Sequence, residues 1–142
     1  MGPELPPELS IVVPLYNEAE SLPPLVEQLL AALRPLGRSF ELVLVDDGSS
    51  DGTASVLRQL AAQTPELVAV LLRRNYGQTP AMSAGFDASR GELIVTLDGD
   101  LQNDPADIPL LLERLEQGYD LVSGWRHQRQ DPAMSRKLPS RV

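Results

Sequence analysis

Short apolar runs alternate with amphipathic stretches along most of this chain, and this alternation constrains its fold more than any other feature. Each apolar run is short, carries β-branched residues and is bounded by turn residues, so it indicates a buried strand. These runs cover residues 9–13, 40–45, 67–72, 93–97 and 121–123. Helical patterns between them cover residues 21–33, 53–62, 79–88 and 107–117. The alternation predicts an α/β domain in which a mostly parallel sheet has helices on both faces.

The first helical segment shows the signals by which its ends are predicted. Ser21 is expected to cap the amino end, because its hydroxyl can accept a backbone N–H of the first turn. Prolines at 23 and 24 are tolerated in that turn. Pro35 and Gly37 are expected to end the helix. Its buried stripe is predicted to consist of Leu25, Leu29, Leu30 and Leu33.

The fourth strand ends abruptly in Asp98-Gly99-Asp100. The glycine between the acids allows a sharp turn, so both carboxylates can converge on one point. Hard divalent cations such as Mg²⁺ bind one or two carboxylates together with phosphate oxygens. The alternative is a polar turn in which an aspartate caps the next helix.

Polar motifs follow the first, second and fourth predicted strands. They occupy residues 14–18, 46–53 and 98–100. Carboxyl ends of parallel strands meet at one edge of a sheet, where ligands bind in open α/β folds. Because a purely structural sheet does not need this clustering, it predicts a nucleotide-type site.

Individual residues at this edge have both functional and structural interpretations. The ring of Tyr16 can stack on a base or pack against the protein. Asp47 is the functional candidate of the Asp46-Asp47 pair, since a carboxylate can accept the ring N–H of a base, whereas Asp51 is interpreted as a structural turn residue. Arg73 and Arg74 either face phosphate or are solvated.

Composition excludes several classes of protein. The chain has no cysteine and one histidine, so disulfides, thiol nucleophiles and zinc sites built from Cys or several His are excluded. No apolar run approaches the roughly 20 residues that span a bilayer. Residues 1–7 lack the features of a secretory signal, so a cytoplasmic location is expected for this chain.

Charge is distributed unevenly. The formal net charge is −8, yet residues 126–142 carry five of the twelve Lys and Arg against a single acid, Asp131. An acidic body with a basic end argues against nucleic-acid binding and suggests a phosphate-bearing partner; the alternative is a solvated basic end. A P-loop, a complete Gly-x-Gly-x-x-Gly and a defensible Ser-His-Asp arrangement are all missing from the sequence.

Three motifs occur in a recognisable order: residues 14–18 (Pro-Leu-Tyr-Asn-Glu), 45–53 (Val-Asp-Asp-Gly-Ser-Ser-Asp-Gly-Thr) and 98–105 (Asp-Gly-Asp-Leu-Gln-Asn-Asp-Pro). In this order and spacing the chain resembles the family 2 glycosyltransferases, which have the GT-A fold, a Rossmann-like nucleotide-sugar-binding fold. It resembles more closely the polyprenyl-phosphate glycosyltransferases, which include the dolichol-phosphate mannose synthases. Residues 74–78 and 123–126 resemble the bacterial undecaprenyl-phosphate branch.

The resemblance implies a metal-dependent, inverting transfer of sugar from a nucleotide-sugar, with UDP-glucose as an example, to a polyprenyl phosphate such as undecaprenyl phosphate. The positions that match those holding the donor nucleotide are Pro14, Tyr16, Glu18, Asp47 and Asp98. The resemblance implies that Asp98 and Asp100 are catalytic, and that these two residues with Gln102 match the ligands of Mg²⁺ or Mn²⁺. The positions that match those binding the acceptor phosphate are Arg126, Arg136 and Ser140.

The resemblance also predicts how the chain is divided. Residues 1–8 are expected to be a disordered N-terminus, 9–125 the nucleotide-sugar-binding core, and 126–142 the start of a truncated acceptor-binding segment. Relatives continue well beyond this point into membrane-associated segments, so the parent protein is expected at the inner face of the cell membrane. We expect this chain to bind nucleotide and metal but to transfer sugar poorly; an exposed sheet edge would favour a homo-oligomer.

Two other functions fit part of the pattern. The chain could be a non-catalytic nucleotide-sugar-binding or interaction module. An aspartyl phosphoryl-transferase also uses an Asp-x-Asp at a strand end, but such enzymes usually need a nearby catalytic lysine. The only lysine here is Lys137, and the Asp-x-Asp follows the fourth strand rather than the first.

Overall fold

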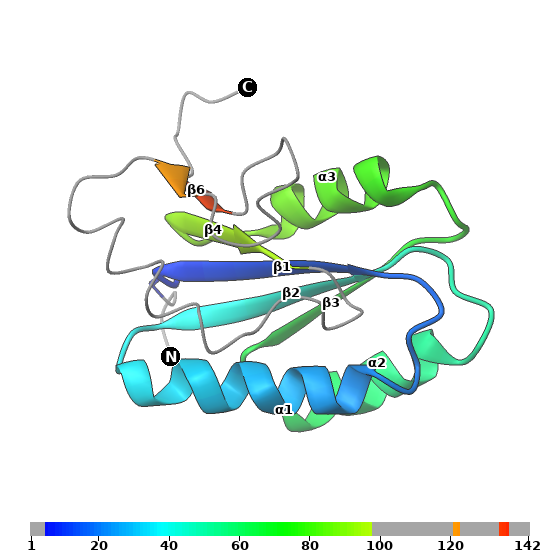
Figure 1. The fold of residues 1–142 in the computed structure, drawn as a ribbon, viewed down its shortest axis with the longest axis horizontal. Helices are drawn as coiled ribbons and strands as arrows, with labels where there is room; N and C mark the ends of the chain where they lie inside the picture. The colour runs from blue at the N-terminus through cyan, green and yellow to red at the C-terminus, as the bar shows by residue number, and fades with distance from the viewer. Residues whose placement is uncertain (1–4, 98–120, 123–133, 137–142) are drawn as a thin grey trace.

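The computed structural model describes residues 5–97, 121–122 and 134–136 (Figure 1). Its elements in chain order are β1 (Leu9–Leu15), α1 (Leu22–Leu33), the 3₁₀ helix η1 (Arg34–Leu36), β2 (Phe40–Asp46), α2 (Thr53–Gln63), β3 (Leu67–Leu71), α3 (Gln78–Ala88), β4 (Leu93–Thr96), β5 (Leu121–Val122) and β6 (Met134–Arg136). The first four predicted strands and first three predicted helices are confirmed to within two residues at each end. The helix predicted over 107–117 lies outside the described residues.

The strands form a single sheet in the order β3-β2-β1-β4-β6-β5. The first four of these in space run parallel, with β1 paired to both β2 and β4, and β2 paired to β3. Strand β6 then runs antiparallel between β4 and β5. The mostly parallel sheet is therefore confirmed. Strand β6 was not predicted, and it lies between β4 and β5.

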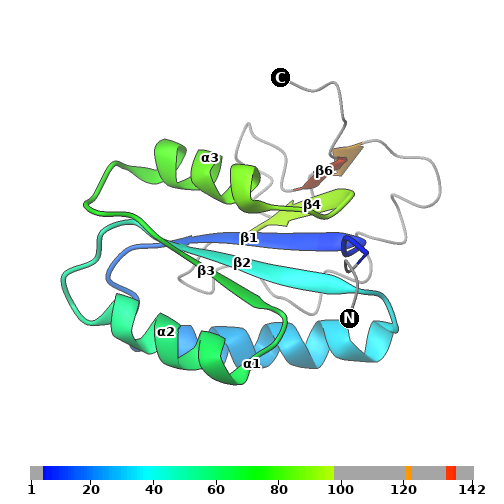
Figure 2. The same cartoon turned by 180° about the vertical axis from the view of Figure 1, so that it is seen from behind.

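Helices cover both faces of the sheet, as predicted: α1 and α2 lie on one face and α3 on the other (Figures 1 and 2). Strand side chains alternate between the faces because successive residues point in opposite directions. The face under α1 and α2 buries Leu9, Ile11, Val13, Leu15, Leu42, Leu44, Val95 and Leu97. The face under α3 buries Val12, Val43, Val45 and Ile94. Burial on both faces explains why these strands are near-continuous apolar runs.

The amino end of α1 differs from the prediction. Ser21 occupies the cap position, but its hydroxyl makes no capping bond to the helix. A capping hydroxyl bonds the N–H of the second or third helical residue, and here these are Pro23 and Pro24, which have none. The Ser21 hydroxyl instead donates to Oε1 of Glu18 at 2.8 Å.

Helix α3 packs against the sheet through small buried residues. Ala81 and Gly85 are its buried positions. A Cβ at Gly85 would lie 2.5 Å from Cγ1 of Val12 and 3.1 Å from Cγ2 of Val45. The close approach therefore requires glycine at this position.

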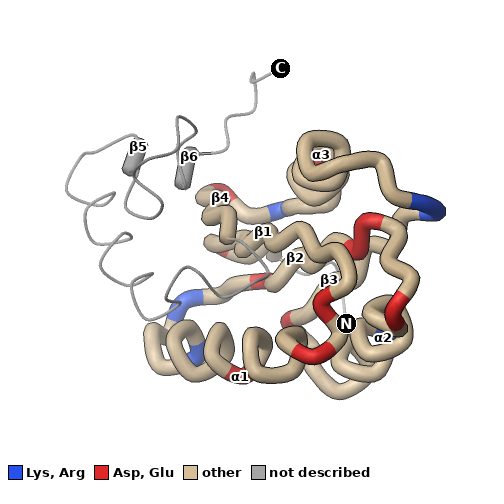
Figure 3. Tube along the Cα trace, turned by 45° about the vertical axis from the view of Figure 1, so that its right-hand side comes forward, with Lys and Arg blue, Asp and Glu red and all other residues tan. Residues whose placement is uncertain are grey.

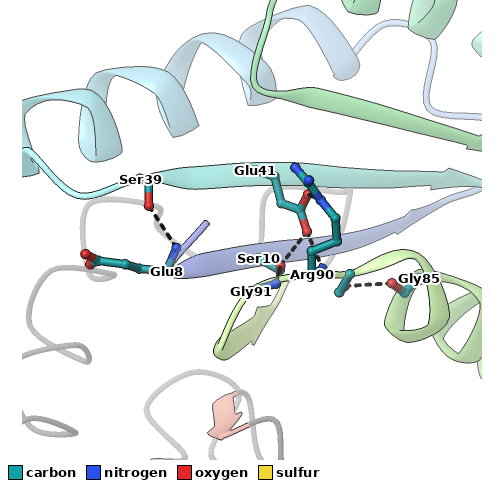
Figure 4. Close-up of polar contacts among 8 residues, drawn as sticks. Glu8, Ser10, Ser39, Glu41, Gly85, Arg90 and Gly91 are labelled. Carbon is teal, nitrogen blue, oxygen red and sulfur yellow. Dashed lines mark hydrogen bonds and ion pairs between the residues drawn. The ribbon is translucent and has the colours of Figure 1, made fainter. Parts of the chain in front are cut away.

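A buried polar cluster ties the amino ends of β1, β2 and β4 together (Figure 4). The Glu41 carboxylate, 3% exposed, accepts from the Ser10 hydroxyl at 2.6 Å and from the Arg90 backbone N–H at 2.7 Å. Ser10 Oγ in turn accepts from the Gly91 N–H at 2.8 Å. The cluster positions the start of β4, the strand that leads to the Asp-x-Asp motif.

The chain is already held at Glu8, one residue before β1. Its backbone N–H donates to the hydroxyl oxygen of Ser39 at 2.9 Å (Figure 4), and its carboxylate pairs with Arg38 at 2.8 Å. Its carbonyl accepts from the N–H of Leu93 at 3.1 Å. These contacts join the start of β1 to the residues before β2 and to the first residue of β4.

Candidate functional site

Three loops lie together at the carboxyl end of the parallel sheet, on the right in Figure 1. They follow β1, β2 and β3 and cover residues 16–21, 47–52 and 72–77. Figure 3 shows acidic residues on this side of the sheet and basic residues on the loop that enters α3. Because open parallel sheets bind ligands at this edge, the three loops form the candidate site.

Side chains join the first two loops. The backbone N–H of Asn17 donates to Ser49 Oγ at 2.8 Å, and Asn17 Oδ1 accepts from the N–H of Ser50 at 2.9 Å. The N–H of Glu18 donates to Oγ1 of Thr53 at 3.0 Å. Asn17 has a φ of 54°, a left-handed conformation that asparagine adopts more readily than most residues. The first two loops are therefore held as one unit.

Asp51 lies at the centre of this junction. Its Oδ2 accepts from the Ala19 N–H at 3.2 Å, and its Oδ1 accepts from the N–H of Thr53 at 3.0 Å and from the Thr53 hydroxyl. The hydrogen bond from the Thr53 hydroxyl lowers the pKa of Asp51, and the backbone N–H groups of Ala19 and Thr53 lower it further. These bonds give Asp51 the structural role that the sequence predicts.

Asp47 joins the second loop to the third. Asp47 is 4% exposed, and its carboxylate accepts three hydrogen bonds. Oδ1 accepts from the backbone N–H of Tyr76 at 2.8 Å. Oδ2 accepts from the Gly77 N–H and from Nδ2 of Asn75, each at 3.1 Å. Asn75 Nδ2 also lies 3.2 Å from the carbonyl oxygen of Asp47, so one amide group contacts both parts of the aspartate.

Gly48 brings the backbones of the same two loops into contact. Its φ is 69°, and a Cβ added there would lie 2.1 Å from the carbonyl carbon of Arg74 and 2.3 Å from the nitrogen of Asn75. Both the backbone conformation and the lack of space require glycine. The third loop therefore lies directly against the end of β2.

Aromatic and basic side chains line the outer part of the site. Tyr16 and Tyr76 are 47% and 46% exposed, on the loops that follow β1 and β3. The Arg74 guanidinium lies 5.0 Å from the centre of the Tyr76 ring, a cation–π contact. Among the ion pairs within residues 5–97, none involves Arg73 or Arg74. Both interpretations of these arginines, phosphate contact and solvation, are compatible with this position.

The donor residues predicted from the sequence lie at this edge wherever the structure describes them. Pro14 is in β1, opposite Val45 of β2, and Tyr16 directly follows the strand. The Glu18 carboxylate contacts the Ser21 hydroxyl. Asp47 follows β2, and its N–H donates to the Leu15 carbonyl at 2.8 Å. Their roles in nucleotide binding stay predictions.

The predicted metal ligands Asp98, Asp100 and Gln102 lie outside the described residues. Leu97, which precedes them, is 2% exposed, and its N–H donates to the carbonyl of Val12 at 3.0 Å. Strand β4 runs parallel to β1 and therefore leads the chain towards the carboxyl edge of the sheet. Within the part of the chain that the structure describes, no three Asp, Glu or His side chains form a metal site.

Of the predicted acceptor residues, Arg126 and Ser140 lie outside the described residues. Arg136 ends β6, where its backbone pairs with Leu93, the first residue of β4. This position is at the amino end of β4, away from the loops of the candidate site. Its role towards the acceptor stays a prediction. Among the described helices, none is both long and apolar enough to cross a membrane.

Sequence reasoning missed the residues that organise the site. The sequence motifs contain Asn17, Gly48 and Asn75 but do not indicate the contacts that these residues make. An asparagine beside a strand end, at the same sheet edge as a buried acid, is the available signal. This signal is weak because Asn75 and Asp47 are 28 positions apart, so local sequence does not show that they are in contact.

The family model described as "Glycosyl transferase family 2" matches residues 10–142. The chain belongs to this family. Family 2 relatives include the undecaprenyl-phosphate 4-deoxy-4-formamido-L-arabinose transferase of Photorhabdus laumondii, which is 53% identical over 137 residues covering 95% of this chain and 42% of the relative. The protein of the same name from Pseudomonas aeruginosa (strain LESB58) is 53% identical over 135 residues, 94% of this chain and 40% of the relative. This family 2 chain therefore spans about two fifths of the length of these curated relatives.

Glycosyltransferase structures share its fold. The mannosyltransferase PcManGT from Pyrobaculum calidifontis, in complex with GDP-Man and Mn²⁺, has a TM-score of 0.67 and 26% identity, over 84% of this chain and 34% of that one. S. aureus TarS 1–349 in complex with UDP-GlcNAc also has a TM-score of 0.67, with 24% identity over 81% of this chain and 33% of that one. The predicted GT-A fold is confirmed.

Proposed function

We propose that this chain is the donor-binding part of a metal-dependent, inverting glycosyltransferase that moves a sugar from a UDP-sugar to a polyprenyl phosphate. The observation that carries the proposal is the arrangement of Tyr16 and Asp47 on joined loops at the carboxyl end of a family 2 sheet. The relatives at 53% identity are named for undecaprenyl phosphate as acceptor and for 4-deoxy-4-formamido-L-arabinose as the sugar. We therefore favour this acceptor, and this sugar over glucose.

Tyr16 and Asp47 divide the recognition of the base between them. The exposed Tyr16 ring offers a flat surface for stacking, while Asp47 accepts a ring N–H of the base. A carboxylate oxygen accepts about two hydrogen bonds, so Oδ2 is filled by Asn75 and Gly77, and Oδ1 has one position left beside the Tyr76 N–H. One open acceptor position on Oδ1 suits uracil, which has a single ring N–H, better than guanine, which presents an N1–H and an adjacent amino group.

The donor set of the predicted metal site fits a divalent cation. Two carboxylates and an amide oxygen, from Asp98, Asp100 and Gln102, are hard ligands of the kind that Mg²⁺ and Mn²⁺ prefer. A bound cation would neutralise the diphosphate leaving group. PcManGT, a protein of this fold, was solved with Mn²⁺.

The remaining chemistry needs little from the protein besides charge and position. A phosphate monoester is already anionic near neutral pH, because its second pKa is about 6, so the attacking oxygen needs no strong general base. Arg126 and Ser140 are proposed to hold this phosphate through charge-assisted hydrogen bonds, whereas the backbone of Arg136 lies at the amino end of β4, away from the donor loops. Orientation and electrostatic stabilisation then supply most of the rate. We propose that the reaction takes place at the inner face of the cell membrane, because the proposed acceptor is a membrane lipid.

A second candidate is supported by the length of the match. Because this chain spans about two fifths of its relatives, it is also suited to be a module that binds a nucleotide-sugar without transferring it. Transfer by the chain alone to undecaprenyl phosphate would favour the enzyme. Binding without transfer would favour the module.

Titration calorimetry with UDP and GDP tests the donor site. Wild-type chain is expected to bind UDP more tightly than GDP. Tyr16→Ala is expected to weaken UDP binding by about tenfold, since stacking of a base on an aromatic ring contributes about 1–3 kcal/mol. Leu5→Ala, at a position 89% exposed and away from the site, is the control and should bind like wild type. Equal binding of UDP by Tyr16→Ala and wild type would contradict the proposed base site.

A further inference from the structure

The amide of Asn75 is placed to control how Asp47 is presented. It comes from the loop after β3, whereas Asp47 follows β2, so the contact crosses between neighbouring strands. Its Nδ2 reaches both the carboxylate and the carbonyl oxygen of Asp47, at 3.1 and 3.2 Å. An amide that contacts both groups restricts rotation of the aspartate side chain.

The other contacts of this loop with Asp47 and Gly48 are made by its backbone. Tyr76 and Gly77 donate their N–H groups to Asp47, and Gly48 packs against the backbone at Arg74. Substitution of side chains in the loop leaves these contacts chemically available. Asn75 is therefore the position at which a side-chain change alters the hydrogen bonding of Asp47 while the loop backbone keeps its own anchors.

We propose that Asn75 is a positioning residue that sets base selectivity. It acts by filling Oδ2 of Asp47, together with the Gly77 N–H, so that one acceptor position on Oδ1 remains for a nucleotide. A base with one ring N–H, such as uracil, satisfies this position. Guanine presents an N1–H and an adjacent amino group, and its second donor would lose its bond to water without gaining another. This inference rests on the proposed donor site at Asp47.

The test measures the ratio of UDP to GDP affinity by calorimetry. Asn75→Ala opens a second acceptor position on Oδ2, so UDP binding should weaken while GDP binding is retained or improved. We expect the ratio to fall about tenfold, the effect of roughly one hydrogen bond to a charged group. Asn75→Ser, which keeps a smaller hydroxyl donor, should give an intermediate ratio and serves if Asn75→Ala does not fold.

Two further variants separate positioning from general support of the loops. Asn17→Gly removes a comparable asparagine contact, the hydrogen bond between Asn17 Oδ1 and the N–H of Ser50. Glycine readily adopts the φ of 54° found at this position. This variant should weaken the binding of UDP and of GDP equally. Asn75 is proposed to act through Asp47. In a chain that already carries Asp47→Asn, adding Asn75→Ala should therefore leave the ratio of UDP to GDP affinity unchanged.

The outcomes are distinct. A fall in the UDP-to-GDP ratio in Asn75→Ala, absent from Asn17→Gly, supports the proposal. An equal loss of both nucleotides in Asn75→Ala, or no change in either, overturns it and leaves the donor site standing. Failure of the folded wild-type chain to bind either nucleotide overturns the donor site itself, and the role of Asn75 with it.

Discussion

Replacement of Glu41 by alanine should be among the most destabilising single changes in this chain. The Glu41 carboxylate is 3% exposed and accepts from the Ser10 hydroxyl and the Arg90 N–H at 2.6 and 2.7 Å. Without it both donors lose their acceptor, and each unsatisfied buried group costs about 1–3 kcal/mol. We therefore expect Glu41→Ala to lower the free energy of unfolding by about 3–5 kcal/mol.

The partners of Glu41 supply matched controls. The Arg90 side chain is 54% exposed and its Nε lies 3.4 Å from the carboxylate. Arg90→Ala removes only the longer contact and keeps the backbone N–H that donates to Glu41 at 2.7 Å, so it should cost less than Glu41→Ala. Glu41→Gln keeps an acceptor oxygen but loses the charge, so its loss of stability should lie between the two alanine variants.

Urea unfolding followed by circular dichroism measures these differences. The expected order of destabilisation is Glu41→Ala, then Glu41→Gln, then Arg90→Ala. The reasoning would be refuted if Glu41→Ala and Arg90→Ala lowered the unfolding free energy equally, because the ion pair between Arg90 and Glu41 would then account for the whole effect. It would be refuted equally if Glu41→Ala were as stable as wild type.

Three further predictions follow from the loops and helix α3. Gly48→Ala should lower stability by more than about 2 kcal/mol and weaken UDP binding, since its Cβ would lie 2.1 Å from the Arg74 backbone; an unchanged melting temperature would contradict this. Gly85→Ala should cost about 1–3 kcal/mol by thermal unfolding, because its Cβ would press on Val12, and would leave UDP affinity of the folded protein unchanged. The pKa of Asp51 is lower in the folded protein than its unfolded value of about 3.8, so ionised Asp51 stabilises the fold at pH values above about 3.8. This contribution is lost as the pH falls through the lower pKa of the folded state. The stability difference between wild type and Asp51→Asn should therefore shrink below about pH 4, and a constant difference would count against it.

Most of the parallel sheet was predictable from sequence because its strands are buried on both faces. Burial on both faces produces continuous apolar runs, as in β1 and β2. Strand β6 has the sequence Met-Ser-Arg and shows no such run. Its place in the sheet depends on pairing with β4, some 40 residues earlier, which local pattern does not reveal.

The location of the candidate site was predictable from sequence, but the hydrogen bonds that join its loops were not. Tyr16 and Asp47 were expected at the carboxyl edge because they directly follow strands. That Asp47 anchors the loop after β3 could not be anticipated, since its partners Asn75, Tyr76 and Gly77 lie 28 to 30 positions away. The missing cap at Ser21 was the opposite case. Pro23 and Pro24 have no backbone N–H, so the sequence itself excludes a capping bond at Ser21.

Metal-dependent binding of UDP tests the central claim most directly. UDP is titrated into wild-type chain with Mn²⁺ and again with EDTA, and both titrations are repeated on Asp100→Asn. Asp87→Asn removes the same charge from an exposed position in α3 and serves as the control. The account predicts that Mn²⁺ strengthens UDP binding to wild type and to Asp87→Asn but not to Asp100→Asn. The same UDP affinity with and without Mn²⁺ in wild type, or the same gain from Mn²⁺ in Asp100→Asn, would contradict it.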